Sequence, residues 1–272
     1  MCEVPLVELH NGVKIPQLGL GVYKVEKGNE AYQTVSTALS SGYRHIDTAS
    51  FYDNEIEVGN AIKDSGISRE DLFITTKVWN DEQGYEKTLA AFDRSLSKLQ
   101  LEYVDLYLIH WPVPGFQETW KALEKLYTDG RVRAIGVSNF MKRHLESLLE
   151  TSSVVPMINQ IEFHPKLFLN DLQDYCKRNR IQLQAWSPLA RGRYLDNQTL
   201  IDTGEKYGKT PAQVILRWDI QHGVVTIPKS VHKSRQLENA DIFDFQLTEE
   251  DMERIDELNE NMRVGSDPNE LY

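Results

Sequence analysis

Cysteine, positive charge and long hydrophobic runs are all scarce in this 272-residue sequence. Its two cysteines, Cys2 and Cys176, are too few for a disulfide scaffold and do not form a metal-binding motif. The 30 lysines and arginines, set against 41 aspartates and glutamates, give a formal charge of −11. This acidity argues against nucleic acid or an anionic membrane as the main partner, while a local cluster of cations would still allow an anionic small ligand to bind.

Targeting and membrane-spanning segments are also lacking. The first residues, MCEVPLVELHNG, show no basic start followed by an apolar run, so no secretory signal is predicted. No apolar run approaches the roughly 20 residues that a bilayer-spanning helix needs. With so few cysteines, a reduced, cytoplasmic location is the simplest prediction.

What the sequence does contain is a regular alternation of extended and helical segments. Residues 5–16 predict a β-hairpin with His10-Asn11-Gly12 as its turn. Strands are predicted at 17–21, 43–46, 72–77, 104–110, 132–137, 155–160, 181–187 and 224–227. Helices are predicted at 30–39, 54–63, 85–99, 116–127, 141–149, 169–178, in two segments split near Gly208 and Pro211, and at 236–239 and 249–258.

Eight strands, each followed by helix, predict an α/β fold of the (β/α)₈ TIM-barrel type, as one domain over residues 1–272. The hairpin would cap the bottom of the barrel, and a helix and tail would end the chain. The rival is a doubly wound sheet with a nucleotide crevice, which needs a glycine-rich fingerprint between an early strand and helix. Gly19-Leu20-Gly21 lacks the third glycine and no helix begins there, so the barrel is favoured.

The stretch 42–55, GYRHIDTASFYDNE, carries ionisable groups at the end of a predicted strand. Asp47 and Tyr52 lie between this strand and the next helix, for which Asp53 and Asn54 are predicted N-caps. Polar residues at the carboxyl ends of barrel strands are where such folds place their chemistry. The stretch therefore predicts one side of an active site.

The next two strands end in Lys77 and His110, so these side chains should lie beside Asp47 and Tyr52. A tyrosine has an ordinary pKa of about 10, and an adjacent ammonium should lower it, making the hydroxyl a useful proton donor. A carboxylate would hold the lysine in place, and a histidine would donate a hydrogen bond to a substrate oxygen. The set suits delivery of a proton to a carbonyl oxygen as hydride reaches the carbon.

Each residue also has a purely structural interpretation. Asp47 and Lys77 could form an ordinary buried ion pair, and Tyr52 or His110 alone is more often a packing residue. Gln160 and Glu162 could satisfy only backbone groups. A metal-dependent barrel hydrolase is a further alternative, because His45, Asp47, Lys77, His110 and His164 superficially suit it. It is disfavoured, since the usual His-x-His pair is replaced by His45-x-Asp47 and no metal site is predicted.

Four blocks carry a resemblance to one enzyme family. They are HIDTA with YDNE at 45–55, LYLIHWP at 106–112, IGVSNF at 135–140, and IPKS at 227–230 with Arg235, Glu238 and Asn239 following. In this order, they resemble the aldo-keto reductase signature blocks. The short bacterial and protozoan members are the most similar subgroup, among them glyoxal and methylglyoxal reductases, 2,5-diketo-gluconate reductases and prostaglandin F synthases.

The resemblance implies NADPH-dependent reduction of aldehydes, α-dicarbonyls or ketones to alcohols. Tyr52 would be the general acid, Lys77 and Asp47 would tune it, and His110 would orient the carbonyl. Cofactor binding is implied for Ser138, Asn139, Gln160, Trp186, Ser187, Leu189, Lys229, Ser230, Arg235, Glu238 and Asn239. Within this set, Lys229, Ser230 and Arg235 would hold the 2′-phosphate, which suits a charge-assisted clamp in an acidic protein and favours NADPH over NADH.

The substrate pocket is the least constrained part of the resemblance. Tyr23, where many relatives have tryptophan, together with Phe51, Trp79 and Trp111, would line it. A cofactor-binding but non-catalytic regulatory barrel is the main alternative function, and the intact set of four catalytic residues argues against it. The expected partner is a small carbonyl compound, and a monomer is what the resemblance implies.

Overall fold

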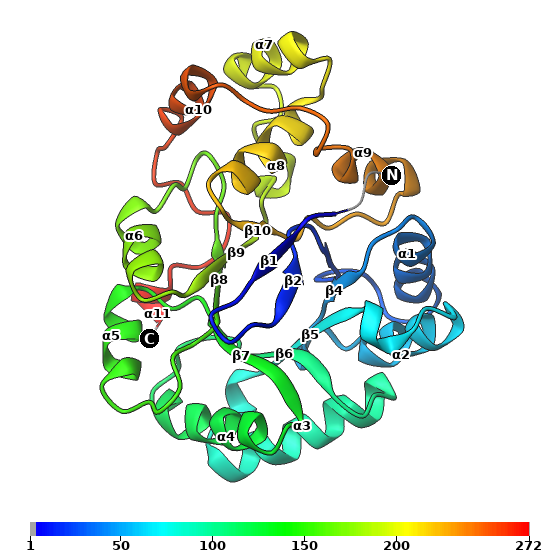
Figure 1. The fold of residues 1–272 in the computed structure, drawn as a ribbon, viewed down its shortest axis with the longest axis vertical. Coiled ribbons are helices and arrows are strands. Elements are labelled where there is room, and N and C mark those ends of the chain that lie inside the picture. Colours follow the sequence, from blue (N-terminus) through cyan, green and yellow to red (C-terminus); the bar gives the residue numbers. More distant parts are fainter. Residues whose placement is uncertain (1–3, 272) are drawn as a thin grey trace.

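The computed structural model describes residues 4–271 as a barrel of strands surrounded by helices (Figure 1). The strands are β1 (Leu6–Glu8), β2 (Lys14–Pro16), β3 (Leu20–Gly21), β4 (His45–Asp47), β5 (Phe73–Val78), β6 (Val104–Ile109), β7 (Val132–Ser138), β8 (Ile158–Glu162), β9 (Gln182–Trp186) and β10 (Val225–Thr226). The helices are α1 (Asn29–Ser40), α2 (Glu55–Asp64), α3 (Tyr85–Leu99), α4 (Phe116–Thr128), α5 (Lys142–Leu149), α6 (Asn170–Arg178), α7 (Gln198–Tyr207), α8 (Pro211–Gln221), α9 (Lys233–Ala240), α10 (Glu249–Asp256) and α11 (Pro268–Leu271).

Strands β3 to β10 pair in sequence order as one parallel sheet, eight-stranded over the described residues. Thr226 closes the sheet into a barrel: its oxygen accepts from Gly19 N at 2.9 Å and its N–H donates to Gln17 O at 2.9 Å. Closure removes the free edges that an open sheet would expose. The predicted (β/α)₈ barrel is confirmed.

Glycine is required where the first strand approaches its neighbours. A Cβ added to Gly19 would lie 2.6 Å from the His45 ring, and one added to Gly21 would lie 2.9 Å from the Ile227 carbonyl oxygen. Any side chain at these two positions would push the barrel walls apart. The Gly19-Leu20-Gly21 sequence therefore serves close packing of strands.

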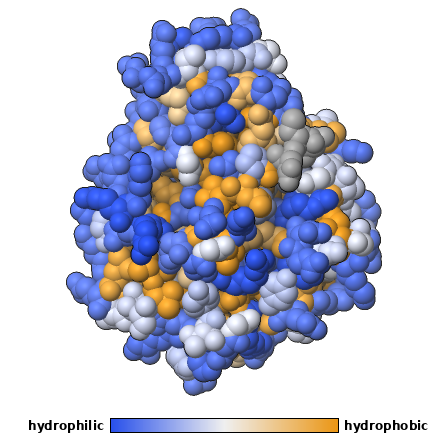
Figure 2. Space-filling model, in the orientation of Figure 1, coloured by the Kyte–Doolittle hydropathy of each residue, from blue (hydrophilic) through white to orange (hydrophobic). Residues whose placement is uncertain are grey.

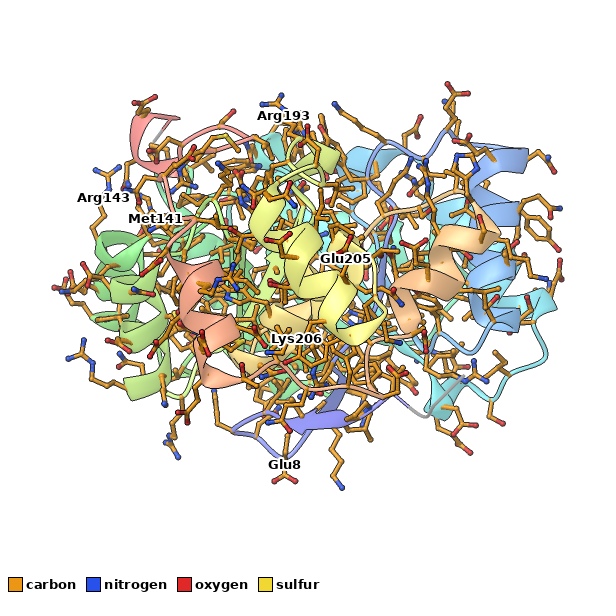
Figure 3. The ribbon with its side chains drawn as sticks, turned by 90° about the horizontal axis from the view of Figure 1, so that it is seen from above. Glu8, Met141, Arg143, Arg193, Glu205 and Lys206 are labelled. Carbon is orange, nitrogen blue, oxygen red and sulfur yellow. The ribbon has the colours of Figure 1, made fainter. Side chains whose placement is uncertain are left out.

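The N-terminal hairpin covers one end of the barrel. Its strands β1 and β2 pair antiparallel, with Leu6 opposite Pro16. The turn residue Asn11 donates from Nδ2 to Arg133 O at 3.0 Å, near the start of β7. Figure 3 shows Glu8 of the hairpin and Arg193, in the loop after β9, at opposite ends of the molecule. Figure 2 shows the hairpin face, where hydrophobic residues are surrounded by a largely hydrophilic rim.

The helices pack one apolar face against the strands. In α3 the buried residues include Phe92, Leu96 and Leu99, spaced by three or four positions as one helix face requires. The facing strand β6 is buried along its whole length, because a parallel barrel strand is covered on both sides. Among the helices of residues 4–271, none has the length and apolar character needed to cross a membrane.

Local structure differs from prediction in two places. Asn54 precedes α2 but its side chain does not cap that helix; it accepts from Thr48 Oγ1 at 2.8 Å and donates to Val22 O at 3.0 Å. Asp53 instead adopts a left-handed conformation with φ 55°. Asn54 thus stands at the predicted N-cap position of α2 without capping it by its side chain, which joins the loop after β3 to the loop after β4, and Asp53 is not the N-cap. The predicted tail also contains a short helix, α11.

Candidate active site

Three of the predicted catalytic side chains meet at one ammonium group. Lys77, in β5, donates from Nζ to Asp47 Oδ1 at 2.6 Å, to Thr48 O at 2.9 Å and to Tyr52 Oη at 3.1 Å. Asp47 ends β4, and Tyr52 follows in a single 3₁₀ turn. Parallel pairing of β4 with β5 places the two strand ends side by side, so residues 25 to 30 positions apart in the chain converge.

The Asp47–Lys77 pair is removed from water, with side-chain exposures of 2% and 0%. Burial raises the pKa of Asp47 and lowers the pKa of Lys77, while their mutual attraction opposes both shifts. Gln160 Nε2 donates to the second carboxylate oxygen of Asp47 at 2.7 Å. The short ion pair and this additional donor favour the charged forms of both residues.

The pKa of Tyr52 is shifted in the direction opposite to the one predicted. Its ring is partly exposed, and its hydroxyl points inward to Lys77. Burial raises the pKa of Tyr52 well above its ordinary value, and the negative charge of Asp47 acts in the same direction. The prediction that the pKa of Tyr52 would be lowered was therefore wrong. At neutral pH the hydroxyl is protonated and can donate.

His110 follows β6 directly and is buried beside this cluster. Its ring lies edge-on to Tyr52, with 5.6 Å between centroids, and to Trp79, at 4.9 Å. Burial lowers the pKa of His110 well below its ordinary value, and the charge of Lys77 adds to the effect. A neutral imidazole that can orient a substrate oxygen without carrying charge is the result.

A second set of hydrogen bonds connects the ends of β7, β8 and β9 to the cluster of predicted catalytic residues. Ser138 Oγ donates to Gln160 O at 2.9 Å, and Asn139 Nδ2 donates to His110 O at 2.9 Å. Trp186 Nε1 donates to Asn139 Oδ1 at 2.8 Å. Four residues that the resemblance assigned to the cofactor thus form one connected layer with the predicted catalytic residues.

The remaining predicted cofactor residues lie in the loop after β9, in the segment after β10 and in α9. Ser187 and Leu189 are half-buried in the loop after β9, where Ser187 has φ 48°. Lys229 and Arg235 are exposed, and neither has an ion-pair or hydrogen-bond partner within residues 4–271. Two such cations fit a site for a phosphate group, because no acidic side chain of the described residues pairs with them.

The rest of this segment is already hydrogen-bonded within the chain. Ser230 Oγ donates to His232 O at 3.3 Å, and Asn239 is buried in α9. Glu238 Oε1 accepts from Thr210 Oγ1 at 2.7 Å, at the start of α8. All five predicted cofactor residues from Lys229 to Asn239 therefore lie in the short stretch between the end of β10 and the end of α9.

Aromatic side chains lie around the ring of Tyr52 and the neighbouring His110 at the surface. Phe51 stacks on Trp79 with 3.7 Å between ring centroids and 16° between planes, and Tyr23 lies 5.0 Å from Tyr52. Phe51 and Tyr23 are 47% and 43% exposed, so these large apolar faces are open to solvent. Trp111, after His110, is also partly exposed. Tyr23, Phe51 and Trp79 thus contact the rings of the site or one another.

Several contributors were missed from the sequence. Gln184, in β9, accepts from Gln160 Nε2 at 2.9 Å and so supports the amide that holds Asp47. The available signal was a second glutamine, alternating with Gln182, within the predicted strand IQLQAWS at 181–187. Glu162 and Gly265 also lie close to Trp186, and no local pattern pointed to that contact. Within the described residues, no group of three or more His, Cys, Asp or Glu side chains is arranged to hold a metal ion.

Comparison with known proteins agrees with this geometry. The model of the Aldo/keto reductase family matches residues 17–260. The glyoxal reductase of Bacillus subtilis is 61% identical over 266 residues, covering 97% of this chain and 96% of that protein. The 9,11-endoperoxide prostaglandin H2 reductase of Trypanosoma cruzi is 54% identical over 275 residues, covering 100% and 97%. The crystal structure of a Bombyx mori aldo-keto reductase in complex with NADP is 37% identical, with TM-score 0.92 and coverage of 98% and 96%.

Proposed function

This chain belongs to the aldo/keto reductase family, and on that premise we propose that it uses NADPH to reduce small aldehydes and α-dicarbonyl compounds to alcohols. The Bacillus subtilis relative is a glyoxal reductase at 61% identity. The open aromatic surface around Tyr52 suits a small or planar carbonyl compound.

The side chains present fit the cofactor. Bound NADPH would supply a hydride to the carbonyl carbon. Asn139, Ser138 and Gln160 present amide and hydroxyl groups for the carboxamide, and Trp186 presents a partly exposed indole for stacking on the nicotinamide ring. Lys229 and Arg235 supply two cations without partners in the described chain, as a 2′-phosphate site requires.

Tyr52 donates the proton to the carbonyl oxygen in this mechanism. Its raised pKa keeps the hydroxyl protonated before the reaction. After the proton leaves, the ammonium of Lys77, 3.1 Å away, stabilises the tyrosinate in a site shielded from water. Asp47 keeps Lys77 charged and fixed. His110, neutral and beside Tyr52, orients the carbonyl oxygen.

The observation that carries the proposal is the bridge formed by one lysine between Asp47 and Tyr52. A barrel that only bound a cofactor would have no use for a proton donor held against a charged lysine. The competing hypotheses of a non-catalytic regulator and a metal-dependent hydrolase both leave this arrangement unexplained.

A panel of aldehydes and α-dicarbonyls, followed through the absorbance of NADPH, tests the proposal. We expect turnover with glyoxal or methylglyoxal and with simple aromatic aldehydes, and full activity after exhaustive chelation of metals. NADPH binding without turnover of any member would support the regulator instead. Loss of activity on chelation, restored by a divalent metal, would support metal chemistry.

A further inference from the structure

Glu162, at the end of β8, is a buried carboxylate that none of the proposed catalytic steps uses. Its Oε1 accepts the backbone N–H of Val264 at 2.5 Å, and its Oε2 accepts that of Gly265 at 3.1 Å. His164 Nε2 lies 3.1 Å from the same Oε1. The side chain of Glu162 is 0% exposed, so this carboxylate relies on these partners and holds a segment 102 residues later in the chain.

The segment held by Glu162 packs directly on Trp186. A Cβ built on Gly265 would lie 2.4 Å from Trp186 Cη2, so only a glycine fits between the backbone and the indole. Cη2 belongs to the six-membered ring, while Nε1, on the five-membered ring, donates to Asn139 Oδ1. The indole is therefore fixed at two points, by β7 through Asn139 and by the C-terminal segment through Gly265.

Met262 N also donates to Lys166 O at 2.9 Å, and Arg263 Nη2 lies 3.7 Å from Met141 Sδ in a partly buried position, while two side-chain contacts of the C-terminal segment lie at the surface. Lys166 pairs with Glu260, whose side chain is 59% exposed, and Arg143 Nη2 donates to Asn269 O at 3.0 Å in an exposed position. Figure 3 shows this segment at the same end of the barrel as Arg193, opposite the hairpin. Exposed ion pairs contribute little to holding a segment, whereas buried charge-assisted hydrogen bonds contribute more.

We propose that Glu162 is a positioning residue for the nicotinamide site, acting through the C-terminal segment. The carboxylate fixes Val264 and Gly265, and Gly265 holds the indole of Trp186 in the orientation that stacks on the nicotinamide ring. The inference rests on the proposed function, because it takes Trp186 to contact the cofactor. A ring that is held in place before the cofactor binds loses less conformational freedom on binding. Release of the segment should therefore weaken the binding of NADPH.

Two substitutions test the contact between Gly265 and Trp186 and the hydrogen bonds by which Glu162 holds this segment. Glu162→Gln keeps the side-chain size but replaces one acceptor oxygen by an NH₂ group, which cannot accept a backbone N–H. Gly265→Ala keeps both carboxylate oxygens of Glu162 and places a methyl group 2.4 Å from Trp186 Cη2, with Glu162 Oε2 as a more distant neighbour at 3.2 Å. Because Gly265 lies outside the left-handed region, alanine there adds this contact without backbone strain. Glu260→Gln is the control, since it makes the same chemical change in the same segment at an exposed position.

The measurements are the dissociation constant of NADPH by fluorescence titration and hydrogen exchange of residues 260–270 without cofactor. We expect Glu162→Gln and Gly265→Ala each to raise the dissociation constant about tenfold, and Glu260→Gln to change it less than about twofold. Glu162→Gln should also speed exchange in the segment. In a Trp186→Phe background, Gly265→Ala should have little further effect, because the smaller ring no longer meets the added methyl group.

Faster exchange in Glu162→Gln with unchanged NADPH affinity would overturn the coupling and leave the proposed function intact. An equal loss of affinity from Gly265→Ala in the Trp186→Phe background would also overturn it, because the effect would not pass through the indole. Failure of the unsubstituted protein to bind NADPH would instead overturn the proposed function and, with it, this inference. The Gly265→Ala result stands even if Glu162→Gln does not fold.

Discussion

Lys77 donates a hydrogen bond to the hydroxyl of Tyr52, with 3.1 Å between Nζ and Oη. The same ammonium is held by Asp47 at 2.6 Å. Tyr52 is therefore protonated at rest, because burial raises its pKa, yet the anion left after proton transfer would lie against a positive charge. In the proposed mechanism, the raised pKa keeps Tyr52 protonated before proton transfer, and Lys77 would stabilise the tyrosinate after it.

Removal of the Lys77 ammonium should lower both the catalytic rate and the folding stability, by effects that can be measured separately. We expect Lys77→Met to lower kcat at least about 100-fold, because the tyrosinate loses its counter-charge. The same change leaves Asp47 buried without its partner, which should lower the free energy of unfolding by about 3 to 5 kcal/mol. Steady-state kinetics and urea denaturation measure the two effects.

The double variant Asp47→Asn/Lys77→Met is the matched control. It removes both buried charges, so most of the lost unfolding free energy should return while kcat stays low. Recovery of kcat together with stability would show that the pair has only a structural role.

Arg235 should distinguish the two nicotinamide cofactors. Arg235→Ala removes a cation without a partner in the described chain, and we expect the dissociation constant of NADPH to rise about 10- to 100-fold. The constant for NADH should change less than about twofold, because NADH has no 2′-phosphate. Arg254→Ala removes the same charge from α10 and serves as the control. Equal losses for both cofactors would exclude a 2′-phosphate site at Arg235.

Phe51 should affect substrate choice more than catalysis. Its ring is 47% exposed and stacks on Trp79 at 3.7 Å. We expect Phe51→Ala to raise KM for aromatic aldehydes about tenfold, because an aromatic contact is lost, and to change KM for methylglyoxal much less. Steady-state kinetics with both substrates, on the variant and on the unsubstituted protein, measure these changes in KM. An equal rise in KM for both substrates would contradict a specific contact between Phe51 and aromatic substrates.

His45 should make the fold sensitive to acid. Burial lowers the pKa of His45 from 6.5 to about 3. As pH falls below about 6.5, the unfolded chain binds this proton while the folded chain does not, so the free energy of unfolding declines until pH reaches the folded pKa. The loss attributable to this residue is on the order of 5 kcal/mol.

The difference between two unfolding curves isolates this contribution. His45→Gln should flatten the decline in unfolding free energy between about pH 6.5 and 3, and His10→Gln, at an exposed position, should not. Identical slopes for the unsubstituted protein and His45→Gln would contradict a neutral buried His45.

The barrel, and the meeting of the residues predicted to be catalytic, were predictable because both depend on short-range patterns. Alternating strands and helices locate the strand ends, and Asp47, Lys77 and His110 stand at three consecutive ends. Parallel pairing then brings them together whatever the details of side-chain geometry. Tyr52 follows from the same pattern, since it lies in the loop after β4.

Contacts between distant segments were not predictable. Gln160 reaches Asp47 across 113 residues of sequence, and its place inside the barrel depends on register and strand tilt, which no local pattern encodes. The predicted direction of the Tyr52 pKa shift was wrong for a related reason. The sequence indicates that a lysine lies nearby, but it does not give the depth of burial, which raises the pKa. Asn54 was read as a cap because its type fits that role locally.

Substitution of Tyr52 by phenylalanine tests the central claim most directly. The change removes one oxygen atom and keeps the ring, so NADPH should bind within about twofold of its original affinity while kcat for glyoxal falls at least about 100-fold. Fluorescence titration and single-turnover oxidation of NADPH, on the same preparation, give both numbers. Reduction of glyoxal by Tyr52→Phe at the unsubstituted rate would contradict the account.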